Sequence, residues 1–357
     1  MNTAVSQQFD AAVTHLRAGL AVVLVDDTTG VCATGDVSLV MAAERITADA
    51  VAGMGGRTSG LLCVALEESR ADRLGLVPMV GSRVERPLGD VFAVTVDARS
   101  DFPVVSAAGR AATIRALADP HTRRTDLSMP GCVFPLRTRP EGVLRVASRA
   151  EAAVDLCQIA GLEPVAVVAK LVDREGMLVG RDDADEVAAQ LTLPAVRLTD
   201  LVRHLRRTTS LIRRWAQARL PTAYGAFTAI GYESTLDGVE HLALTFGSIR
   251  DAGRTLVAVH HECLKGDVFG SADCECRTLL AQSQQQIRDA GSGVLLYLRS
   301  PLPTGFRTGS CPDGGQSDRA DVPYDVVAQI LADLGVGLFD VTAGSALRPD
   351  RIEQLDL

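Results

Sequence analysis

The strongest constraint on the fold is the alternation of short apolar runs with helical periods over the first 200 residues. The runs have four to seven residues, which suits β-strands and falls far short of the roughly 20 residues that cross a bilayer. Strand-like runs cover 22–25, 60–65, 91–96 and 165–171, and helical periods cover 7–20, 108–118 and 151–160. Mixed strands and helices without an internal repeat indicate an α+β or mixed α/β domain.

A change of composition between Thr199 and Leu220 divides the chain. The segment 201–215 is rich in arginine; it fits a solvated helix face that links two domains, or an anion or phosphate contact. Later strand-like runs cover 220–232, 241–246, 255–260 and 293–298, helical periods cover 276–290 and 326–334, and a loop is expected over 300–316. We predict two mixed α/β domains in tandem, overall class α+β, with domain one at 1–205, a linker at 206–218 and domain two at 219–357.

Composition narrows the class of protein. The 357 residues are 47% apolar, which is enough for two cores, and the net charge of −8 argues against a nucleic-acid partner. The first 20 residues lack the basic start, apolar run and cleavage site of a signal peptide, so we expect a cytoplasmic protein with no membrane partner. In that compartment the eight cysteines are expected to be thiols or metal ligands.

Three cysteines form the strongest chemical signal. Cys263, Cys274 and Cys276 lie within fourteen residues, among Gly, Asp and Glu. Two thiolates two residues apart, with a third from the preceding loop, can hold Zn²⁺ and leave a fourth position open for water. The alternative is a set of buried thiols, as we expect for Cys32, Cys63, Cys132 and Cys157, which show no ligand spacing.

This stretch resembles the GTP cyclohydrolase II family. The family carries Arg-Val-His-Ser-Glu-Cys-Leu-Thr-Gly-Asp and then Ser-x-Arg-Cys-Asp-Cys; this chain has Ala258-Val-His-His-Glu-Cys-Leu-Lys-Gly-Asp and then Ser271-Ala-Asp-Cys-Glu-Cys. All three metal cysteines match, and the resemblance covers about 219–340. It implies zinc, and a reaction in which zinc-bound water attacks C8 of guanine while an arginine forms a covalent link to the α-phosphate.

Several of that family's nucleotide contacts are missing from this chain. The resemblance assigns substrate contacts to Glu262, Arg299 and Thr342, which are kept. The motif's first arginine is replaced by Ala258, and the arginine before the second cysteine by Asp273, a reversal of charge. The segment that follows Arg299 in the family is replaced, from Ser300 and Pro301 onward.

The family's nucleophilic arginine is also displaced. Alignment on the last helix puts Val322 at its position, and Arg319, three residues away, is the remaining weak candidate for a catalytic residue.

The first half, from about Phe9 to Leu205, resembles 3,4-dihydroxy-2-butanone-4-phosphate synthase. The resemblance rests on Ala21-Val-Val-Leu-Val-Asp-Asp, Ser59-Gly-Leu-Leu-Cys, Val105-Ser-Ala-Ala-Gly-Arg-Ala-Ala-Thr-Ile-Arg-Ala and Pro130-Gly-Cys-Val-Phe-Pro-Leu-Arg. It implies a Mg²⁺ site for ribulose 5-phosphate, held by oxygen ligands and a histidine.

That magnesium site is expected to be lost. The two glutamates of the family's acidic loop fall on Cys32 and Thr34, and the ligand histidine becomes Arg149. A second histidine is Cys132, and an aspartate is Gly109, although Arg110 and Thr113 persist. Arg149 suggests either a bidentate phosphate contact or an exposed arginine at a helix start.

The sequence therefore predicts a riboflavin-biosynthesis-type protein, impaired in both halves, with a retained zinc site. One alternative is a zinc-dependent hydrolase that acts on GTP or a related purine ring. Another is an ordinary riboflavin-biosynthesis enzyme whose residues align with the family in a different register. A small molecule such as GTP, and a second copy of the chain in a homodimer, are the partners expected.

Overall fold

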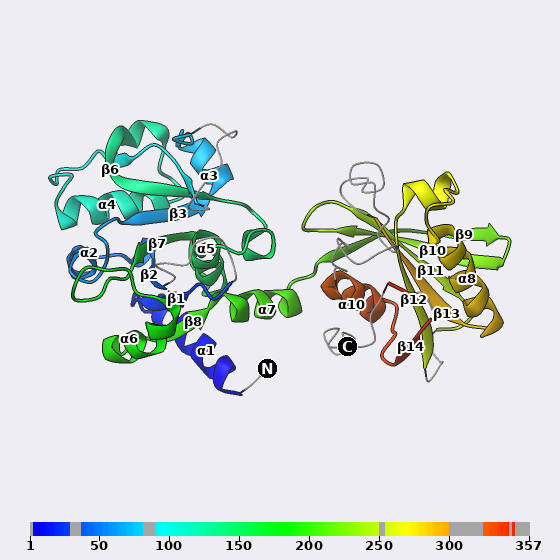
Figure 1. The fold of residues 1–357 in the computed structure, drawn as a ribbon. Helices are drawn as coiled ribbons and strands as arrows, with labels where there is room; N and C mark the ends of the chain where they lie inside the picture. The colour runs from blue at the N-terminus through cyan, green and yellow to red at the C-terminus, as the bar shows by residue number, and fades with distance from the viewer. Residues whose placement is uncertain are drawn as a thin grey trace. The chain divides into compact units, whose positions relative to one another are not determined.

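A computed structural model describes residues 3–28, 37–80, 90–249, 254–299, 324–342 and 345–346. Backbone contacts divide the chain into two compact units, Met1–Leu205 and Arg206–Leu357. Figure 1 traces the first unit from blue to green and the second from green to red. Among the helices of the described residues, none has the length and apolarity that a membrane crossing needs. The fold is α+β, with mixed α/β domains in tandem.

The first unit is an eight-stranded mixed sheet with helices on both faces. Strand order is β4-β6-β3-β7-β2-β1-β8, with β5 paired to β6. The strands are β1 (Val22–Val25), β2 (Val37–Ala42), β3 (Cys63–Glu67), β4 (Val91–Phe92), β5 (Val96–Ala98), β6 (Leu127–Thr138), β7 (Val165–Lys170) and β8 (Ala195–Arg197). The helices are α1 (Thr3–Arg17), α2 (Ala48–Gly55), α3 (Glu68–Arg73), α4 (Ala107–Ala118), α5 (Arg149–Ile159), α6 (Ala184–Leu191) and α7 (Leu198–Thr208).

Alternating side chains of this sheet supply two separate cores. On β1, Val23 and Val25 join one core, which α2, α4 and α6 cover, whereas Val22 and Leu24 join the other, which α1, α5 and α7 cover. Successive side chains on a strand point to opposite faces, so a continuous apolar run fits a strand buried on both sides.

Two serine caps fix the helices that carry the substituted residues of this unit. The Ser106 hydroxyl accepts a hydrogen bond from Gly109 N at 3.0 Å and starts α4. The Ser148 hydroxyl accepts from Ala150 N at 3.2 Å and starts α5, so Arg149 is the first residue of that helix. Such caps satisfy backbone donors that have no partner inside the helix.

The second unit is a six-stranded sheet ordered β14-β12-β13-β11-β10-β9. Its strands are β9 (Ile212–Thr222), β10 (Gly225–Ser234), β11 (Glu240–Phe246), β12 (Thr255–His261), β13 (Gly293–Leu298) and β14 (Phe339–Val341). The helices among its described residues are α8 (Cys276–Asp289) and α10 (Tyr324–Asp333), and a π-helical turn covers Leu264–Val268. Strands β13 and β14 are both parallel to β12, so their carboxyl ends point the same way.

Three details differ from the sequence-based expectations. The linker predicted over 206–218 is largely structured, because α7 continues to Thr208 and β9 begins at Ile212. The single strand expected over 220–232 is a hairpin, because Gly225 at φ +124° lets the chain reverse after β9. The strand expected over 91–96 is split into β4 and β5, because Val94 N donates to Val77 O at 2.9 Å instead of to β6.

Candidate metal centre and the substituted site of the first domain

The three predicted metal cysteines converge at the end of β12. Cys263 follows this strand, Cys274 lies in the next loop, and Cys276 is the first residue of α8. Their sulfur atoms all lie within 4.8 Å of one another, and the Cys263 and Cys274 sulfurs are 3.9 Å apart. Zn–S bonds of about 2.3 Å in tetrahedral geometry place two sulfurs about 3.8 Å apart. The donor set therefore fits a zinc ion.

Gly266 provides the space that the cysteine cluster needs. A Cβ atom at this position would lie 2.6 Å from the Cys274 sulfur and 3.0 Å from the Cys276 Cβ. The Gly266 N–H donates a hydrogen bond to the Cys263 sulfur at 3.3 Å. A donor to sulfur favours the thiolate, which is the form that binds metal.

Burial differs among the three thiols. Cys263 and Cys276 are buried, whereas Cys274 is partly exposed. Among the described residues, Cys274 is therefore the cysteine of the cluster beside which a fourth ligand could enter.

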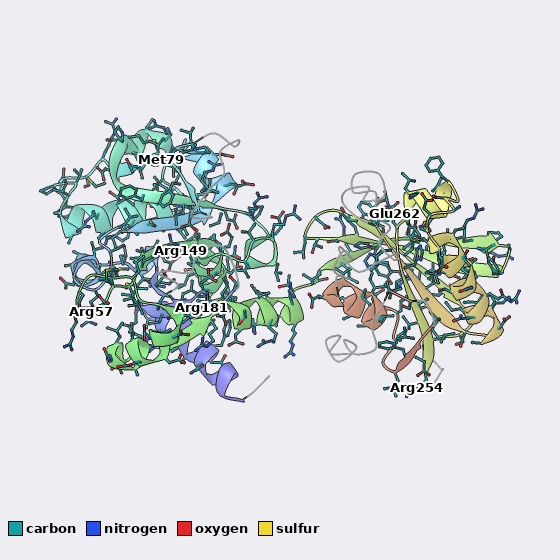
Figure 2. All side chains as sticks on the ribbon, viewed as in Figure 1. Arg57, Met79, Arg149, Arg181, Arg254 and Glu262 are labelled. Carbon is teal, nitrogen blue, oxygen red and sulfur yellow. The ribbon has the colours of Figure 1, made fainter. Side chains whose placement is uncertain are left out.

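Glu262 and Arg299 lie together beside this cluster, at the carboxyl ends of β12 and β13. Arg299 Nε is 3.6 Å from Glu262 Oε1, and Arg299 Nη1 is 3.4 Å from Glu240 Oε2. Figure 2 labels Glu262 at this end of the second unit. Carboxyl ends of parallel strands are the usual place for a ligand in such sheets. Arg299 is thus available at the site, but two carboxylates already share its charge.

Thr342 lies apart from this pair. Its backbone N donates to Val257 O at 3.0 Å, five residues before Glu262 on β12, which corresponds to roughly 15 Å along a strand. Its hydroxyl is buried with no hydrogen-bond partner among the described residues. The structure therefore brings Glu262 and Arg299 together, whereas Thr342, which follows β14, lies beside the middle of β12.

The reversed charge at Asp273 has a partner that the sequence did not indicate. Lys265 Nζ lies 2.9 Å from Asp273 Oδ2, and the hydrogen bond from Lys265 lowers the pKa of Asp273. Ala258, where the family has an arginine, is fully buried in the core that α8 covers. Pro301, Arg319 and Val322 lie outside the described residues.

Arg149 is not the exposed arginine that was one of the two expectations from the sequence. Its side chain is 16% exposed and pairs with Asp90. Arg149 Nε donates to Asp90 Oδ2 at 3.0 Å, and Nη2 makes a second, shorter contact with the same oxygen. The Asp90 side chain is only 2% exposed, so the pair is an internal structural element of the first unit. Figure 2 labels Arg149 near the sheet of this unit.

The substituted Gly109 and the retained Thr113 are also built into the packing of the first domain. A Cβ atom on Gly109 would lie 2.3 Å from Pro103 O, so the backbone of residue 103 occupies the space that a side chain would need. The Thr113 hydroxyl donates to Gly109 O and accepts from Ala98 N, so it is engaged within the fold. Cys32 and Thr34 lie outside the described residues.

Of the cysteines that the structure describes in this domain, two are buried thiols as expected and one is not. Cys63 and Cys157 are buried, and burial raises the pKa of Cys63 to about 11 and that of Cys157 to about 12. Cys132, on β6, is partly exposed, contrary to expectation, and its N–H donates to Asp97 Oδ1 at 2.9 Å.

Sequence reasoning did not identify Asp90, Lys265 or Asp267 as part of these sites. Asp267 could have been found, because it ends the cysteine motif, and Lys265 is one of only two lysines in the chain. Asp90 carries no such signal, since 59 residues separate it from Arg149.

Comparison with known proteins agrees with this architecture. The family model for 3,4-dihydroxy-2-butanone 4-phosphate synthase matches residues 10–204, and that for GTP cyclohydrolase II matches residues 213–308. The bifunctional riboflavin biosynthesis protein RIBA 1, chloroplastic, of Arabidopsis thaliana is 40% identical over 343 residues, 91% of this chain and 63% of that protein. Riboflavin biosynthesis protein RibBA of Salinispora arenicola is 40% identical over 345 residues, 92% of this chain and 81% of that protein. The chain thus spans less than two thirds of the plant relative.

Solved structures of 3,4-dihydroxy-2-butanone 4-phosphate synthases are also similar to this chain. RibBX, a two-domain 3,4-dihydroxy-2-butanone 4-phosphate synthase from A. baumannii, is similar with a TM-score of 0.72 and 27% identity, covering 96% of this chain and 95% of that one. A 3,4-dihydroxy-2-butanone 4-phosphate synthase in complex with two magnesium ions covers 56% of this chain and 96% of that one, with a TM-score of 0.51 and 31% identity. The chain belongs to the riboflavin-biosynthesis family that joins a 3,4-dihydroxy-2-butanone 4-phosphate synthase domain to a GTP cyclohydrolase II domain.

Proposed function

We propose that this protein is a riboflavin-biosynthesis homologue that binds zinc at Cys263, Cys274 and Cys276 and is catalytically impaired in both halves. One observation carries the proposal. Charged residues that replace family site residues are paired within the chain, Arg149 with Asp90 and Asp273 with Lys265. Groups engaged in this way hold their partners in this chain instead of a metal ion or a nucleotide.

The first domain does not fit the magnesium ion of its family. The resemblance requires a metal ligand at the position of Arg149, and the guanidinium of this residue is paired with the buried carboxylate of Asp90. Gly109 has no room for the aspartate that the family carries. Mg²⁺ needs several oxygen ligands in near-ideal geometry. We therefore assign no dihydroxybutanone phosphate synthesis to this domain.

The second domain fits zinc better than it fits GTP. Three sulfurs at suitable spacing would hold the ion, which supplies a Lewis acid and can activate a water molecule when bound. Fewer groups remain to hold the nucleotide. The buried Ala258 replaces an arginine of the family, and the charge of Arg299 is shared between Glu240 and Glu262. Removal of one positioned charge commonly costs about 10²–10³ in rate, so we expect no normal turnover of GTP.

One observation favours a second candidate function, a zinc-dependent hydrolase acting on GTP or a related purine ring. Cys274 is partly exposed, so a ligand could enter the cysteine cluster beside it. A small ring without a triphosphate would not need the missing phosphate contacts. A small molecule related to GTP as ligand, and a homodimer as the assembly, belong to the same proposal.

Two assays on the full chain test these alternatives. Formate release and pyrophosphate release are measured separately with GTP, and a Cys274→Ala/Cys276→Ala variant serves as the matched control. If neither formate nor pyrophosphate is released, the impaired homologue is supported. Release of formate alone supports the repurposed hydrolase, and release of both products refutes impairment of the second half. Dihydroxybutanone phosphate formed from ribulose 5-phosphate at about 0.1–1 s⁻¹ or faster, near the usual enzyme range, would refute impairment of the first half.

A further inference from the structure

We infer that Asp267 is the positioning residue of the cysteine cluster: it orients Cys263 for the metal and is not itself a ligand. This inference rests on the proposed zinc site. Asp267 lies in the π-helical turn that follows Cys263, and its side chain is 6% exposed. A buried carboxylate is costly unless hydrogen bonds satisfy it.

Donors from three segments meet at this carboxylate. Oδ2 accepts from Cys263 N at 2.9 Å and from the Tyr297 hydroxyl at 2.8 Å, and His260 Nε2 lies 3.1 Å from both oxygens. His260 belongs to β12 and Tyr297 to β13, and their rings stack with centroids 5.5 Å apart. Asp267 therefore ties the turn after Cys263 to the ends of two parallel strands.

Backbone hydrogen bonds between Asp267 and Cys263 complete this arrangement. Asp267 N donates to Cys263 O at 2.7 Å, while the Asp267 carboxylate accepts from Cys263 N. Both backbone groups of Cys263 are thus bound to a single residue, and Gly266 N–H holds its sulfur. These hydrogen bonds within the chain fix the position of this thiol, which lowers the ordering cost of metal binding.

The carboxylate itself is not placed to serve as the fourth ligand. Among the described residues, the group that can converge on one ion consists of Cys263, Cys274 and Cys276, without Asp267. Both of its oxygens already have hydrogen-bond partners, which are His260, the Cys263 N–H and the Tyr297 hydroxyl. Residues that orient metal ligands in this way typically change metal affinity by about 10–100-fold when they are replaced.

The test compares zinc binding in the full chain with that of Asp267→Asn, which keeps the shape of the side chain but loses charge and one acceptor. Zinc affinity is measured by competition with a chromophoric chelator, and the site is examined by Co²⁺ substitution. We expect affinity to fall about 10–100-fold and the Co²⁺ d–d bands to shift. The control is Asp340→Asn on β14, an exposed carboxylate paired with Arg254, which should change neither.

The outcomes separate this inference from the zinc site on which it rests. A wild type that binds no zinc overturns the site itself. A wild type that binds zinc, with an Asp267→Asn variant of equal affinity and identical Co²⁺ spectrum, overturns only the positioning role. If Asp267→Asn does not fold, Tyr297→Phe replaces it, because it removes one hydroxyl donor from the carboxylate; unchanged affinity and spectrum in that variant likewise overturn the role.

Discussion

The ion pair between Arg149 and Asp90 allows a quantitative test of the first domain. Arg149→Met keeps the length of the side chain but leaves Asp90 without its partner, and the Asp90 side chain is only 2% exposed. Breaking a buried pair from one side costs about 3–5 kcal/mol. In a unit of about 200 residues, each kcal/mol shifts the melting temperature by about 2–4 °C. The first-domain transition should therefore fall by about 6–20 °C.

The double variant Arg149→Met/Asp90→Val separates the pair from its individual charges. Replacing both partners by apolar groups removes the uncompensated charge, so stability should return to near the wild-type value or above it. A double-mutant cycle then gives a large coupling energy. Calorimetry on the full chain measures both variants, and the first-domain transition is recognised because a zinc chelator does not move it.

A surface pair supplies the control for this experiment. Arg254 and Asp340 are 62% and 57% exposed, and Arg254→Met should leave both transitions unchanged. An Arg149→Met variant that melts with the wild type would refute the reasoning, because it would mean that Asp90 is not held by Arg149. A rise in the first-domain melting temperature on adding Mg²⁺ would contradict the loss of the metal site.

Three further predictions concern glycine packing, zinc and pH. Gly109→Ala should destabilise the first domain by about 1–3 kcal/mol through overpacking, whereas Gly53→Ala, with open space around it in α2, should not; urea unfolding compares them. Elemental analysis should find about one zinc per chain, lost in Cys274→Ala/Cys276→Ala, and a well-folded wild type without zinc would contradict the site. Burial raises the pKa of Asp155 to about 6, so proton binding stabilises the fold at low pH and this contribution is lost as pH rises through 6. Asp155→Asn should therefore weaken the decline in first-domain urea midpoint between about pH 4 and 6, the interval between the ordinary and the raised pKa, and an unchanged decline would rule out this carboxyl as its source.

The sequence predicted most of the elements because local patterns determine them. The helices over 108–118, 151–160 and 276–290 and the strands over 165–171 and 293–298 agree with α4, α5, α8, β7 and β13 to within two residues. Their periodicity reflects which face is buried, and that property is written along one segment.

The errors arose where the partner of a segment decides its structure. The run 91–96 is apolar except for Thr95, but Val94 pairs with Val77, and no local pattern shows that exchange. The alternation over 220–232 concealed a turn, since only the positive φ of Gly225 distinguishes a hairpin from one long strand.

In the candidate sites, too, local spacing was predictable and contacts with partner residues were not. Cys263, Cys274 and Cys276 were predicted from spacing within fourteen residues, and the structure brings their sulfurs together. The partners Asp90 and Lys265 were not predicted, because a substituted charge does not reveal which distant or neighbouring residue neutralises it. Resemblance to a family identifies what has been replaced, whereas only the fold shows what the replacement contacts.

The two ion pairs, Arg149–Asp90 and Lys265–Asp273, differ in how much they can contribute to stability. Asp90 and Arg149 are 2% and 16% exposed, so their pairing is a matter of folding: either charge alone would be costly inside the domain. Lys265 and Asp273 are 26% and 76% exposed, and pairs in such surroundings add little to stability. Folding therefore accounts for the substitution in the first domain but not for the one beside Cys274. The difference that remains is in the charge beside the cysteine cluster, because Lys265 offsets Asp273 and the pair is neutral where the family places a positive charge. An anionic triphosphate is the ligand that this change disfavours most, and a neutral ring is the ligand it disfavours least.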